Sequence, residues 1–562
     1  MTDFNHFNVP YTVDRQFDRR VAYFCMEFGI DPALKIYSGG LGYLAGSHMR
    51  SAHDLRQNMV GIGIHWKFGY YDQTRRPNGN MDALFQERHY NFLQDTGIRF
   101  TVTVNHHDVH VKALYLAPEV FGTAPMFLLS TDLPENDHLA QTITHRLYDN
   151  NPETKIAQCI VLGVGGAKLL EALHWTPDTY HLNEAHALPA AFYLYRQLGD
   201  LERVRERLVV TTHTPVEAGN EKHNIGLLEH MSFFGDLPIG TVRHITGTDG
   251  EVFNHTLVAL RMTKVGNGVS KIHGGVSRKM WTDYPGVPEI THVTNAQHRG
   301  FWQDAALRKA LDGKKHKAFA ARKVELKERL FEIVADQTGK LFDPSVLTLV
   351  WARRFAGYKR ADLITQDVER FARLAVNTER PIQIIWAGKP YPQDFDSVRL
   401  FNHLVQLSHR FPNLAVLTGY EMNLSKALKE GADVWLNNPR VPREASGTSG
   451  MTAAMNGAVN LSTWDGWIPE FSRHGHNGFT IPVVDLTLPQ AQQDIADRDA
   501  LLDVLEYEIL PLYYDDPKGW REVSQNSMRE VVEFFDSNRM AAEYYTQVYS
   551  APVSVPKGAV LV

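Results

Sequence analysis

The chain has 562 residues, of which 43% are hydrophobic and 22% are charged. At roughly 100–200 residues per domain, this length predicts two or more domains, and the composition excludes disordered and fibrous classes. The 58 Lys and Arg against 64 Asp and Glu give a net charge of −6, which excludes a basic surface for nucleic acid or an anionic membrane. Any anion must therefore be bound by a few placed residues.

Cysteine usage and the N-terminus bear on the cellular compartment. Only Cys25 and Cys159 occur, which excludes a disulfide framework and any Cys-rich metal site. The first residues lack the positive-then-apolar order of a secretory signal, and no run of about 18 apolar residues follows. We therefore expect a cytoplasmic protein with no membrane partner and no metal.

The first 300 or so residues alternate short β-rich apolar runs with helical patterns, as at 207–212 and then 227–231. This alternation predicts βαβ units and a parallel sheet. The segment from 305 to about 336 is rich in Lys, Arg, Glu and Ala, which favours a long connecting helix or an interdomain bridge over a strand. A second alternating series follows, with strands expected at 346–351, 382–386, 414–417 and 434–436. Amphipathic helices are expected at 500–512 and 525–548, and a loose tail at 552–562.

This order predicts an α/β protein with two Rossmann-like parallel-sheet domains that face a central cleft. The N-terminal domain spans 1–304 and the C-terminal domain spans 305–490, while 491–562 supply helices that pack back across the domains plus the tail. Because open parallel sheets bind ligands beyond the carboxyl ends of their strands, the chemistry is expected in that cleft.

Three glycine-rich or cationic segments could meet an anion. Tyr37–Gly46 contains a Gly-Gly-x-Gly turn that runs into a helical pattern, where backbone N–H groups can bind a phosphate or sugar oxygen. A tight structural turn is the alternative. Arg353–Arg360 places four cations directly after a predicted strand, which suits phosphate oxygens. Its alternative is a solvated loop that pairs with Asp362.

The third segment is Arg443–Gly457, in which small and hydroxyl residues precede a helical Met-Thr-Ala-Ala-Met stretch. It predicts an anion site at a helix start, beside the Glu444 carboxylate, which could accept hydrogen bonds from ligand hydroxyls. A structural helix cap would explain the Ser and Thr residues but not this density of glycine next to a carboxylate.

Other patterns favour plain structural roles. His106–His110 lies in a β-like run whose side chains alternate, so a surface hairpin is favoured over a metal site. Gly163–Gly166 lies within a helical pattern, so helix packing is favoured over a dinucleotide site. Asp465 and Glu470 could imitate the carboxylate pair of a glycosidase, which we regard as the weaker interpretation.

Six strings in chain order resemble the α-glucan (glycogen, maltodextrin) phosphorylase family, in particular its shorter bacterial branch. The match recurs in order from about residue 20 to residue 480, and the six strings lie at 36–42, 180–186, 211–215, 293–295, 353–360 and 444–457. The resemblance implies a GT-B fold and reversible, anomer-retaining glucosyl transfer between an α-1,4-glucan and phosphate.

The resemblance also implies roles for individual residues. Phosphate would be held by Arg353, Arg354 and Lys359, and backbone N–H groups would come from Gly40 and Leu41. The glucosyl unit would contact His213 and Asn295 near its 6-hydroxyl, and Glu444, Ser446 and Gly447 near its 3-hydroxyl. The backbone carbonyl of His213 could stabilise positive charge at the anomeric carbon. Thr448 and Ser449 would lie where the family binds a cofactor phosphate.

One position departs from the family. Its members bind pyridoxal phosphate through a lysine directly after the Met of this glycine string, and here that residue is Thr452, which cannot form an imine. The nearest lysines in sequence, Lys426 and Lys429, precede the loop, and no neighbour in sequence substitutes.

Three hypotheses stay open at this point. The first is a phosphorylase that uses untethered pyridoxal phosphate or none. The second is a nucleotide-sugar glucosyltransferase, whose diphosphate would take the cofactor's place. The third is a non-catalytic glucan-binding relative. The expected partners are an α-glucan or maltodextrin, a phosphate or sugar phosphate, and a second copy in a homodimer.

Overall fold

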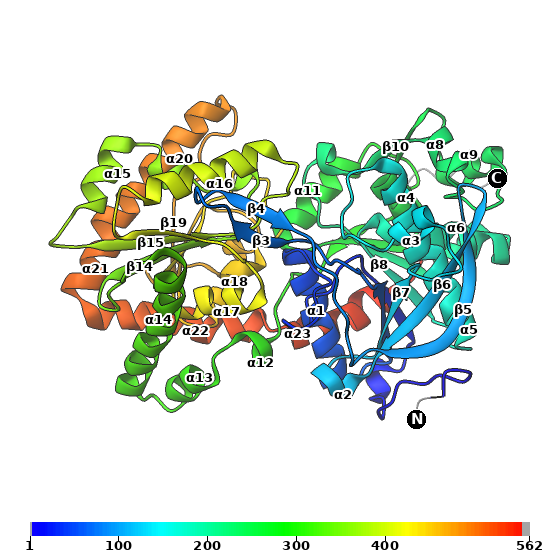
Figure 1. The fold of residues 1–562 in the computed structure, drawn as a ribbon, viewed down its shortest axis with the longest axis horizontal. Coiled ribbons are helices and arrows are strands. Elements are labelled where there is room, and N and C mark those ends of the chain that lie inside the picture. The colour runs from blue at the N-terminus through cyan, green and yellow to red at the C-terminus, as the bar shows by residue number, and fades with distance from the viewer. Residues whose placement is uncertain (1–2, 554–562) are drawn as a thin grey trace. The chain divides into compact units, whose positions relative to one another are not determined.

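The structure is a computed structural model, and it describes residues 3–553. The chain forms two compact units, shown in Figure 1. Unit 1 contains the N-terminal residues to 70, residues 85–295 and the segment that begins at 537, and unit 2 contains 71–84 and 296–536. The domain boundaries predicted at 304 and 490 stay predictions.

Unit 1 is built on a nine-stranded sheet in the order β13-β12-β9-β8-β1-β2-β7-β6-β5. The strands from β13 to β7 run parallel, and β6 joins β7 and β5 in antiparallel pairs at one edge. Their bounds are β1 Val21–Phe24, β2 Met59–Ile64, β5 Gln94–Val104, β6 His107–Leu116, β7 Met126–Ser130, β8 Thr179–Asn183, β9 Leu208–Thr211, β12 Val265–Gly268 and β13 Ile290–His292. A small antiparallel pair comprises β10 Lys222–Asn224 and β11 Val252–Asn254.

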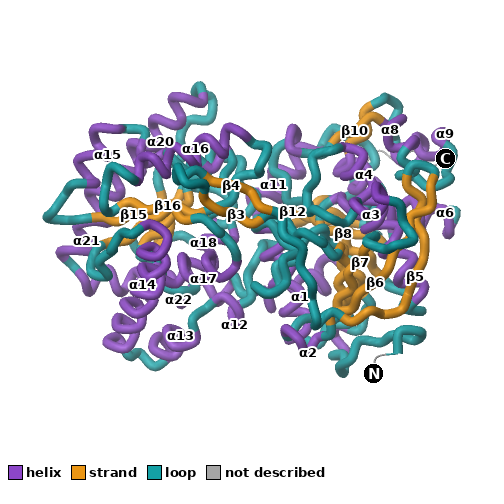
Figure 2. The backbone as a smooth tube through the Cα atoms, viewed as in Figure 1, coloured by secondary structure: helices purple, strands orange, loops and turns teal. Residues whose placement is uncertain are grey.

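Helices flank this sheet (Figure 2). They are α1 Gly40–Asp54, α2 Pro118–Phe121, α3 His138–Thr142, α4 Pro152–Ile160, α5 Gly166–Ala172, α6 Pro189–Leu198, α7 Leu201–Arg205, α8 Ile225–His230, α9 Ile239–Thr246, α10 His255–Arg261, α11 Lys271–Trp281 and α23 Ser537–Glu543. Every residue of β1, β2 and β8 is buried, as expected for parallel strands covered on both faces.

Unit 2 contains a six-stranded sheet in the order β16-β15-β14-β17-β18-β19, in which all neighbours are parallel. The strands are β14 Leu347–Ala352, β15 Ile382–Ala387, β16 Leu414–Leu417, β17 Val434–Asn437, β18 Val459–Ser462 and β19 Gly478–Thr480. Its helices are α12 Arg299–Trp302, α13 Ala305–Asp312, α14 His316–Thr338, α15 Val368–Ala375, α16 Phe395–Ser408, α17 Met422–Gly431, α18 Thr448–Ala454, α19 Ile468–Phe471, α20 Gln490–Val504, α21 Leu510–Asp515 and α22 Pro517–Phe534. The predicted α/β class with two parallel-sheet units is confirmed.

Two segments join a unit that is distant from them in sequence. The hairpin of β3 Asp72–Arg75 and β4 Met81–Leu84 belongs to unit 2, where the Tyr71 hydroxyl donates to the Pro390 carbonyl at 2.7 Å. In unit 1, the C-terminal helix α23 packs on α1, and the Ser51 and Ser537 hydroxyls lie 2.6 Å apart. Figure 1 shows this red helix beside the blue one.

The helical segment expected from 305 to about 336 is divided into two helices. The segment forms α13 and α14, because Gly313 ends the first helix and Lys314 takes a positive φ of 51°. The helix expected at 525–548 is likewise interrupted, since α22 ends at Phe534 and α23 starts at Ser537. Composition favours helix at both places but does not show where a turn interrupts it. Most of the predicted tail lies outside the described residues.

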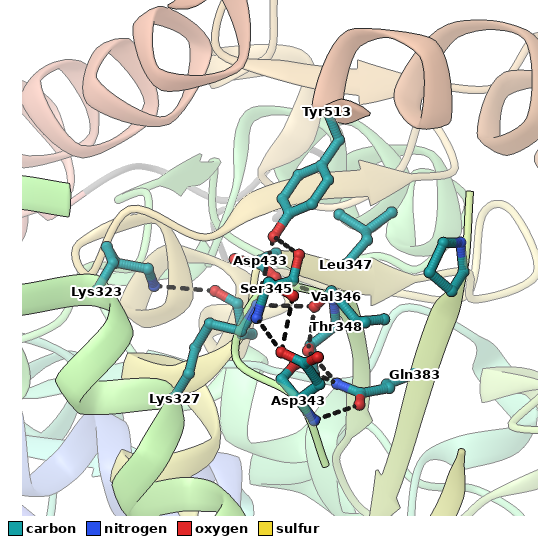
Figure 3. A network of polar contacts seen from close by, with 12 residues as sticks. Lys323, Lys327, Asp343, Ser345, Val346, Leu347, Thr348, Gln383, Asp433 and Tyr513 are labelled. Atoms are coloured by element: carbon teal, nitrogen blue, oxygen red, sulfur yellow. Dashed lines mark hydrogen bonds and ion pairs between the residues drawn. The ribbon is translucent and has the colours of Figure 1, made fainter. Parts of the chain in front are cut away.

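A buried ion pair ties α14 to the amino ends of two strands of unit 2 (Figure 3). Lys327 Nζ lies 2.5 Å from the Asp433 carboxylate and donates to the Val346 carbonyl at 2.8 Å. Asp433 also accepts the Thr348 N–H at 2.9 Å, and the Tyr513 hydroxyl points toward the pair. The network therefore fixes α14 and α21 against the end of the sheet opposite its carboxyl edge.

No helix within residues 3–553 has the length and apolar character that a membrane crossing requires.

Candidate active site

In unit 1, the predicted sugar-contacting residues follow strands whose carboxyl ends meet at one edge of the sheet. β8, β9, β12 and β13 are parallel neighbours. His213 follows β9 and Asn295 follows β13, so both lie beyond this edge. This is the part of a parallel sheet where ligands bind.

The His213 ring is uncharged and fixed by its neighbours. Its Nε2 lies 2.8 Å from Asn183 Oδ1 at the end of β8, so this nitrogen carries the proton. Its backbone N–H donates to the Glu184 carboxylate. Burial lowers the pKa of His213 to about 3, which keeps the imidazole neutral near pH 7. A neutral ring suits contact with a sugar hydroxyl better than contact with phosphate.

Asn295 presents a polar atom that lacks a protein partner. Its side chain is 2% exposed, and within residues 3–553 its Oδ1 makes no hydrogen bond. A buried amide oxygen without a donor is costly, by about 1–3 kcal/mol. A ligand hydroxyl could supply that donor, as the predicted role of Asn295 requires.

The predicted glycine loop is held by a carboxylate that the sequence analysis did not assign. Glu27, just after β1, accepts the Ser38 N–H at 2.6 Å and the Gly39 N–H at 3.1 Å. It also accepts the Tyr148 hydroxyl at 2.7 Å. These bonds fix the turn from which α1 starts at Gly40, so the first N–H groups of a long helix are presented in a defined place.

Two glycines of α1 are needed for close packing. A Cβ on Gly42 would lie 2.7 Å from Glu27 Oε2, and one on Gly46 would lie 2.0 Å from the Gly29 carbonyl oxygen. We expect Gly46→Ala to lower the free energy of unfolding of unit 1 by about 1–3 kcal/mol, because the backbone must move apart. Gly40→Ala is the matched control, since its Cβ would meet nothing within 4 Å. Equal melting temperatures for the two variants would contradict the packing argument.

In unit 2, Arg353 follows β14 at the carboxyl edge of the sheet and is 5% exposed. Its guanidinium donates to the Asn437 amide oxygen at the end of β17 and lies 3.4 Å from a Glu444 oxygen. The same nitrogen that donates to Asn437, Nη2, also lies 3.5 Å from Ser449 Oγ. Arg353 therefore joins the strand ends to the glycine loop.

Glu444 collects the cations of this edge. Lys359 Nζ donates to Glu444 Oε2 at 2.7 Å, on the oxygen that Arg353 also approaches. Despite the burial of the carboxylate, the charges of Lys359, Arg353 and Arg354 hold the pKa of Glu444 below its usual range. Arg354 itself is exposed. The structure thus brings the three predicted phosphate-binding cations together around one carboxylate.

The fourth cation of this segment belongs to a different network. Arg360 pairs with Asp494 at 2.8 Å and with Asp497 at 2.8 Å, and it donates to the Asn438 carbonyl. For Arg353, Lys359 and Arg360, the structure shows carboxylates more distant in sequence as partners in place of Asp362, whereas Arg354 is exposed. Long-range pairing of this kind is not visible in local composition.

Asp465 is a second carboxylate beside Glu444 with a different protonation state. It accepts the Glu444 backbone N–H at 2.8 Å and is 1% exposed. Burial raises the pKa of Asp465 to about 7, whereas that of Glu444 is lowered. The different environments of these neighbouring carboxylates separate their pKa values, an arrangement seen in acid–base sites.

The glycine loop of unit 2 leads into α18 as predicted. Gly447 takes a φ of 89°, a conformation that favours glycine, and α18 starts at Thr448. Ser446 is 5% exposed, and its hydroxyl has no hydrogen-bond partner within the described part of the chain. Ser446, Thr448 and Ser449 therefore gather hydroxyl groups at the end of the loop nearest Arg353.

Two further sequence predictions concern structural segments, and both are confirmed. β5 and β6 form a hairpin whose turn includes Asn105 and His106, and His107 is exposed. Gly163 lies in a short π-helix, Val161–Gly165, between α4 and α5, and a Cβ at this position would lie 2.7 Å from the Ala187 carbonyl oxygen. Within residues 3–553, no group of three or more His, Cys, Asp or Glu side chains is placed to hold a metal ion.

Comparison with known proteins shows the family of this chain. The family model for carbohydrate phosphorylases matches residues 258–476. A maltodextrin phosphorylase of Thermococcus litoralis is 34% identical over 95% of this chain and 71% of its own length. A glycogen phosphorylase of Aquifex aeolicus is 30% identical over 97% of this chain and 90% of its own length. The chain belongs to the carbohydrate phosphorylase family. An uncharacterized protein of Methanocaldococcus jannaschii is 44% identical over 94% of this chain and 99% of its own length.

The family uses pyridoxal phosphate, and unit 2 fits only part of that group. The buried Ser446 hydroxyl and the Arg353 Nε atom have no hydrogen-bond partner among residues 3–553, so a phosphate could satisfy them. The position for covalent attachment does not fit. Thr452 is 1% exposed, and its hydroxyl donates to the Ser449 carbonyl of its own helix at 3.0 Å. These groups leave polar atoms that a phosphate could satisfy, but the Thr452 side chain cannot attach the cofactor through an imine.

Because the pKa of Asp465 is raised, the stability of the fold should depend on pH. A carboxyl whose pKa is higher in the folded state stabilises the fold fully below its unfolded value of about 4, and this contribution is lost as the pH rises through about 7. We expect the free energy of unfolding of the wild type to fall relative to Asp465→Asn by up to about 1.4 kcal/mol per pH unit between about pH 5 and 7. Urea unfolding of both proteins at several pH values measures this difference. Parallel plots of unfolding free energy against pH for the wild type and Asp465→Asn would contradict the prediction.

Proposed function

We propose that this phosphorylase-family protein transfers a glucosyl unit between an α-1,4-glucan or maltodextrin and phosphate, with retention at the anomeric carbon. The observation that carries this proposal is the cation cluster of Arg353, Arg354 and Lys359 around Glu444. One buried carboxylate does not balance three cations, so the edge keeps a positive field for an oxyanion.

Each group has a role set by its chemistry. Arg354 and Lys359 stabilise charge on the phosphate that attacks or leaves, and Arg353 positions the glycine loop beside them. The neutral His213 ring and the Asn295 amide oxygen bind sugar hydroxyls, and the His213 carbonyl stabilises positive charge at the anomeric carbon. The Gly40 and Leu41 N–H groups, held through Glu27, act in the same reaction.

In unit 2, Glu444, Ser446 and Gly447 are proposed to bind the sugar's 3-hydroxyl region. Thr448 and Ser449 are proposed to bind a cofactor phosphate that, when present, can donate and accept a proton at the substrate phosphate. We include a cytoplasmic location, which suits the two buried, free cysteines Cys25 and Cys159, and a homodimer.

The test is an assay for glucose 1-phosphate released from maltodextrin and inorganic phosphate, with and without added pyridoxal phosphate. Release that depends on phosphate is expected. Absence of glucose 1-phosphate in both mixtures, from protein that is folded by circular dichroism, would overturn the proposal.

The Thr452 hydroxyl, engaged in its own helix, favours one second candidate, a nucleotide-sugar glucosyltransferase. Its diphosphate would occupy the cation cluster without a covalent link. For this candidate, UDP-glucose or ADP-glucose should raise the melting temperature, and pyridoxal phosphate should leave the melting temperature unchanged. A protein that binds maltodextrin but turns over neither donor would instead be a non-catalytic relative.

A further inference from the structure

Glu184, the residue that follows β8, has a main-chain conformation that residues with a side chain rarely adopt. Its φ is 68° and its ψ is 169°, a combination that essentially only glycine takes without strain. Arg360 also has a positive φ, of 50°, but its ψ of 59° lies in the left-handed helical region that other residues can enter. The chain therefore carries a glutamate where a glycine would fit the backbone more easily. Strain of this kind persists only where surrounding contacts fix it, and it is concentrated at functional sites.

Hydrogen bonds of both the main chain and the side chain hold Glu184, which is half-buried. Its backbone N–H donates to the Thr211 carbonyl at 2.9 Å, which joins the end of β8 to the end of β9. Its carboxylate oxygen Oε1 accepts the His213 N–H and lies 3.4 Å from Thr214 Oγ1. The same oxygen thus contacts the chain on both sides of the His213 carbonyl.

The ring of His213 and the preceding amide have other partners. Asn183 Oδ1 lies 2.8 Å from the ring nitrogen Nε2, and the Thr212 N–H donates to the Asn267 carbonyl at 3.0 Å. A change at residue 184 should therefore disturb the main chain at His213 while leaving the contact between its ring and Asn183 in place.

We propose that Glu184 is a positioning residue for the proposed glucosyl transfer, because its carboxylate fixes the main chain at His213 so that the His213 carbonyl faces the anomeric carbon. The inference rests on the proposed function for the reaction, but the hydrogen bond to the His213 N–H can be tested without it. The carbonyl acts on charge that develops in the transition state, so displacing it should lower kcat more than it raises KM.

The experiment compares the purified full-length wild type with Glu184→Gly, which relaxes the backbone and removes the carboxylate. Amide hydrogen exchange, resolved at single residues by fragmentation mass spectrometry, should be at least about tenfold faster at His213 in the variant. Exchange at Thr212, whose N–H donates to Asn267, is the internal control and should not change. With maltodextrin and phosphate, kcat should fall by on the order of a hundredfold at little changed KM for maltodextrin.

Two further variants separate positioning from a purely structural role. Glu184→Gln keeps an oxygen that can accept the His213 N–H, so it should lose less activity than Glu184→Gly. His174→Gly also removes a side chain from a positive φ, of 51°, but at an exposed position after α5. It should keep both the activity and the two exchange rates.

Unchanged exchange at His213 in Glu184→Gly, equal acceleration at His213 and Thr212, or a loss of kcat below about threefold would overturn the inference. Should Glu184→Gly fail to fold, Glu184→Asp takes its place, because its carboxylate is one methylene short of the His213 N–H. A wild type that releases no glucose 1-phosphate would contradict the proposed function, while the exchange rates would still decide whether Glu184 fixes His213. An active wild type whose His213 exchange does not depend on residue 184 would contradict only this inference.

Discussion

Arg354→Ala is expected to lower kcat/KM for glucosyl transfer by at least about a hundredfold, the range for losing one key electrostatic contact. Arg354 follows β14 and is exposed, and its charge reaches the Glu444 carboxylate. Arg353 is buried, and both of its terminal guanidinium nitrogens face protein acceptors, on Asn437 and Glu444. Arg354 is the cation of this edge best placed to meet a substrate oxyanion.

Initial rates at several phosphate concentrations measure the effect. Arg354→Lys should recover part of the activity, because it keeps the charge but loses bidentate geometry. Arg399→Ala is the control for removing a cation from unit 2, since the Arg399 side chain is 73% exposed on α16 and pairs with its helix neighbour Asp396. A loss below about threefold for Arg354→Ala would remove Arg354 from the site.

Asp433→Ala is expected to lower the free energy of unfolding of unit 2 by about 3–5 kcal/mol. Lys327 and Asp433 are 3% and 8% exposed, and removing the carboxylate leaves a buried ammonium with only neutral partners nearby. For a unit of this size, the melting temperature should fall by roughly 10 °C, as differential scanning calorimetry can measure.

Two controls separate loss of the ion pair from loss of side-chain volume. Asp396→Ala, which breaks an exposed pair, should change stability by less than about 0.5 kcal/mol. The double variant Lys327→Met/Asp433→Leu should recover much of the loss, because no charge is then left buried. An Asp433→Ala protein as stable as Asp396→Ala would contradict a structural role for the network of Figure 3.

Local sequence was sufficient for features that depend on neighbours along the chain. The apolar runs at 346–351 and 382–386 predicted β14 and β15 within one residue, because parallel strands covered on both faces need such runs. The glycine turns before α1 and α18 were likewise visible as loops that feed helices. A single Gly313 was too weak a signal to show the break between α13 and α14.

Partners distant in sequence were not predicted. Glu27, which holds the glycine loop, had one available signal, an acidic residue directly after an apolar strand, but its partners Ser38 and Tyr148 are set by folding. Asp465 was considered only as one of a glycosidase pair, and its contact with the Glu444 backbone gives it another role.

The amino-acid order by itself determined the α/β class, the family and the absence of a lysine at position 452, because these depend on residue identity and spacing. Tertiary structure alone decided that Glu444 gathers Arg353 and Lys359, that Arg360 pairs elsewhere, and that Glu184 contacts the His213 backbone. Charge pairing and desolvation act through space, so residues separated by tens of positions set each other's protonation and reactivity only once the chain has folded.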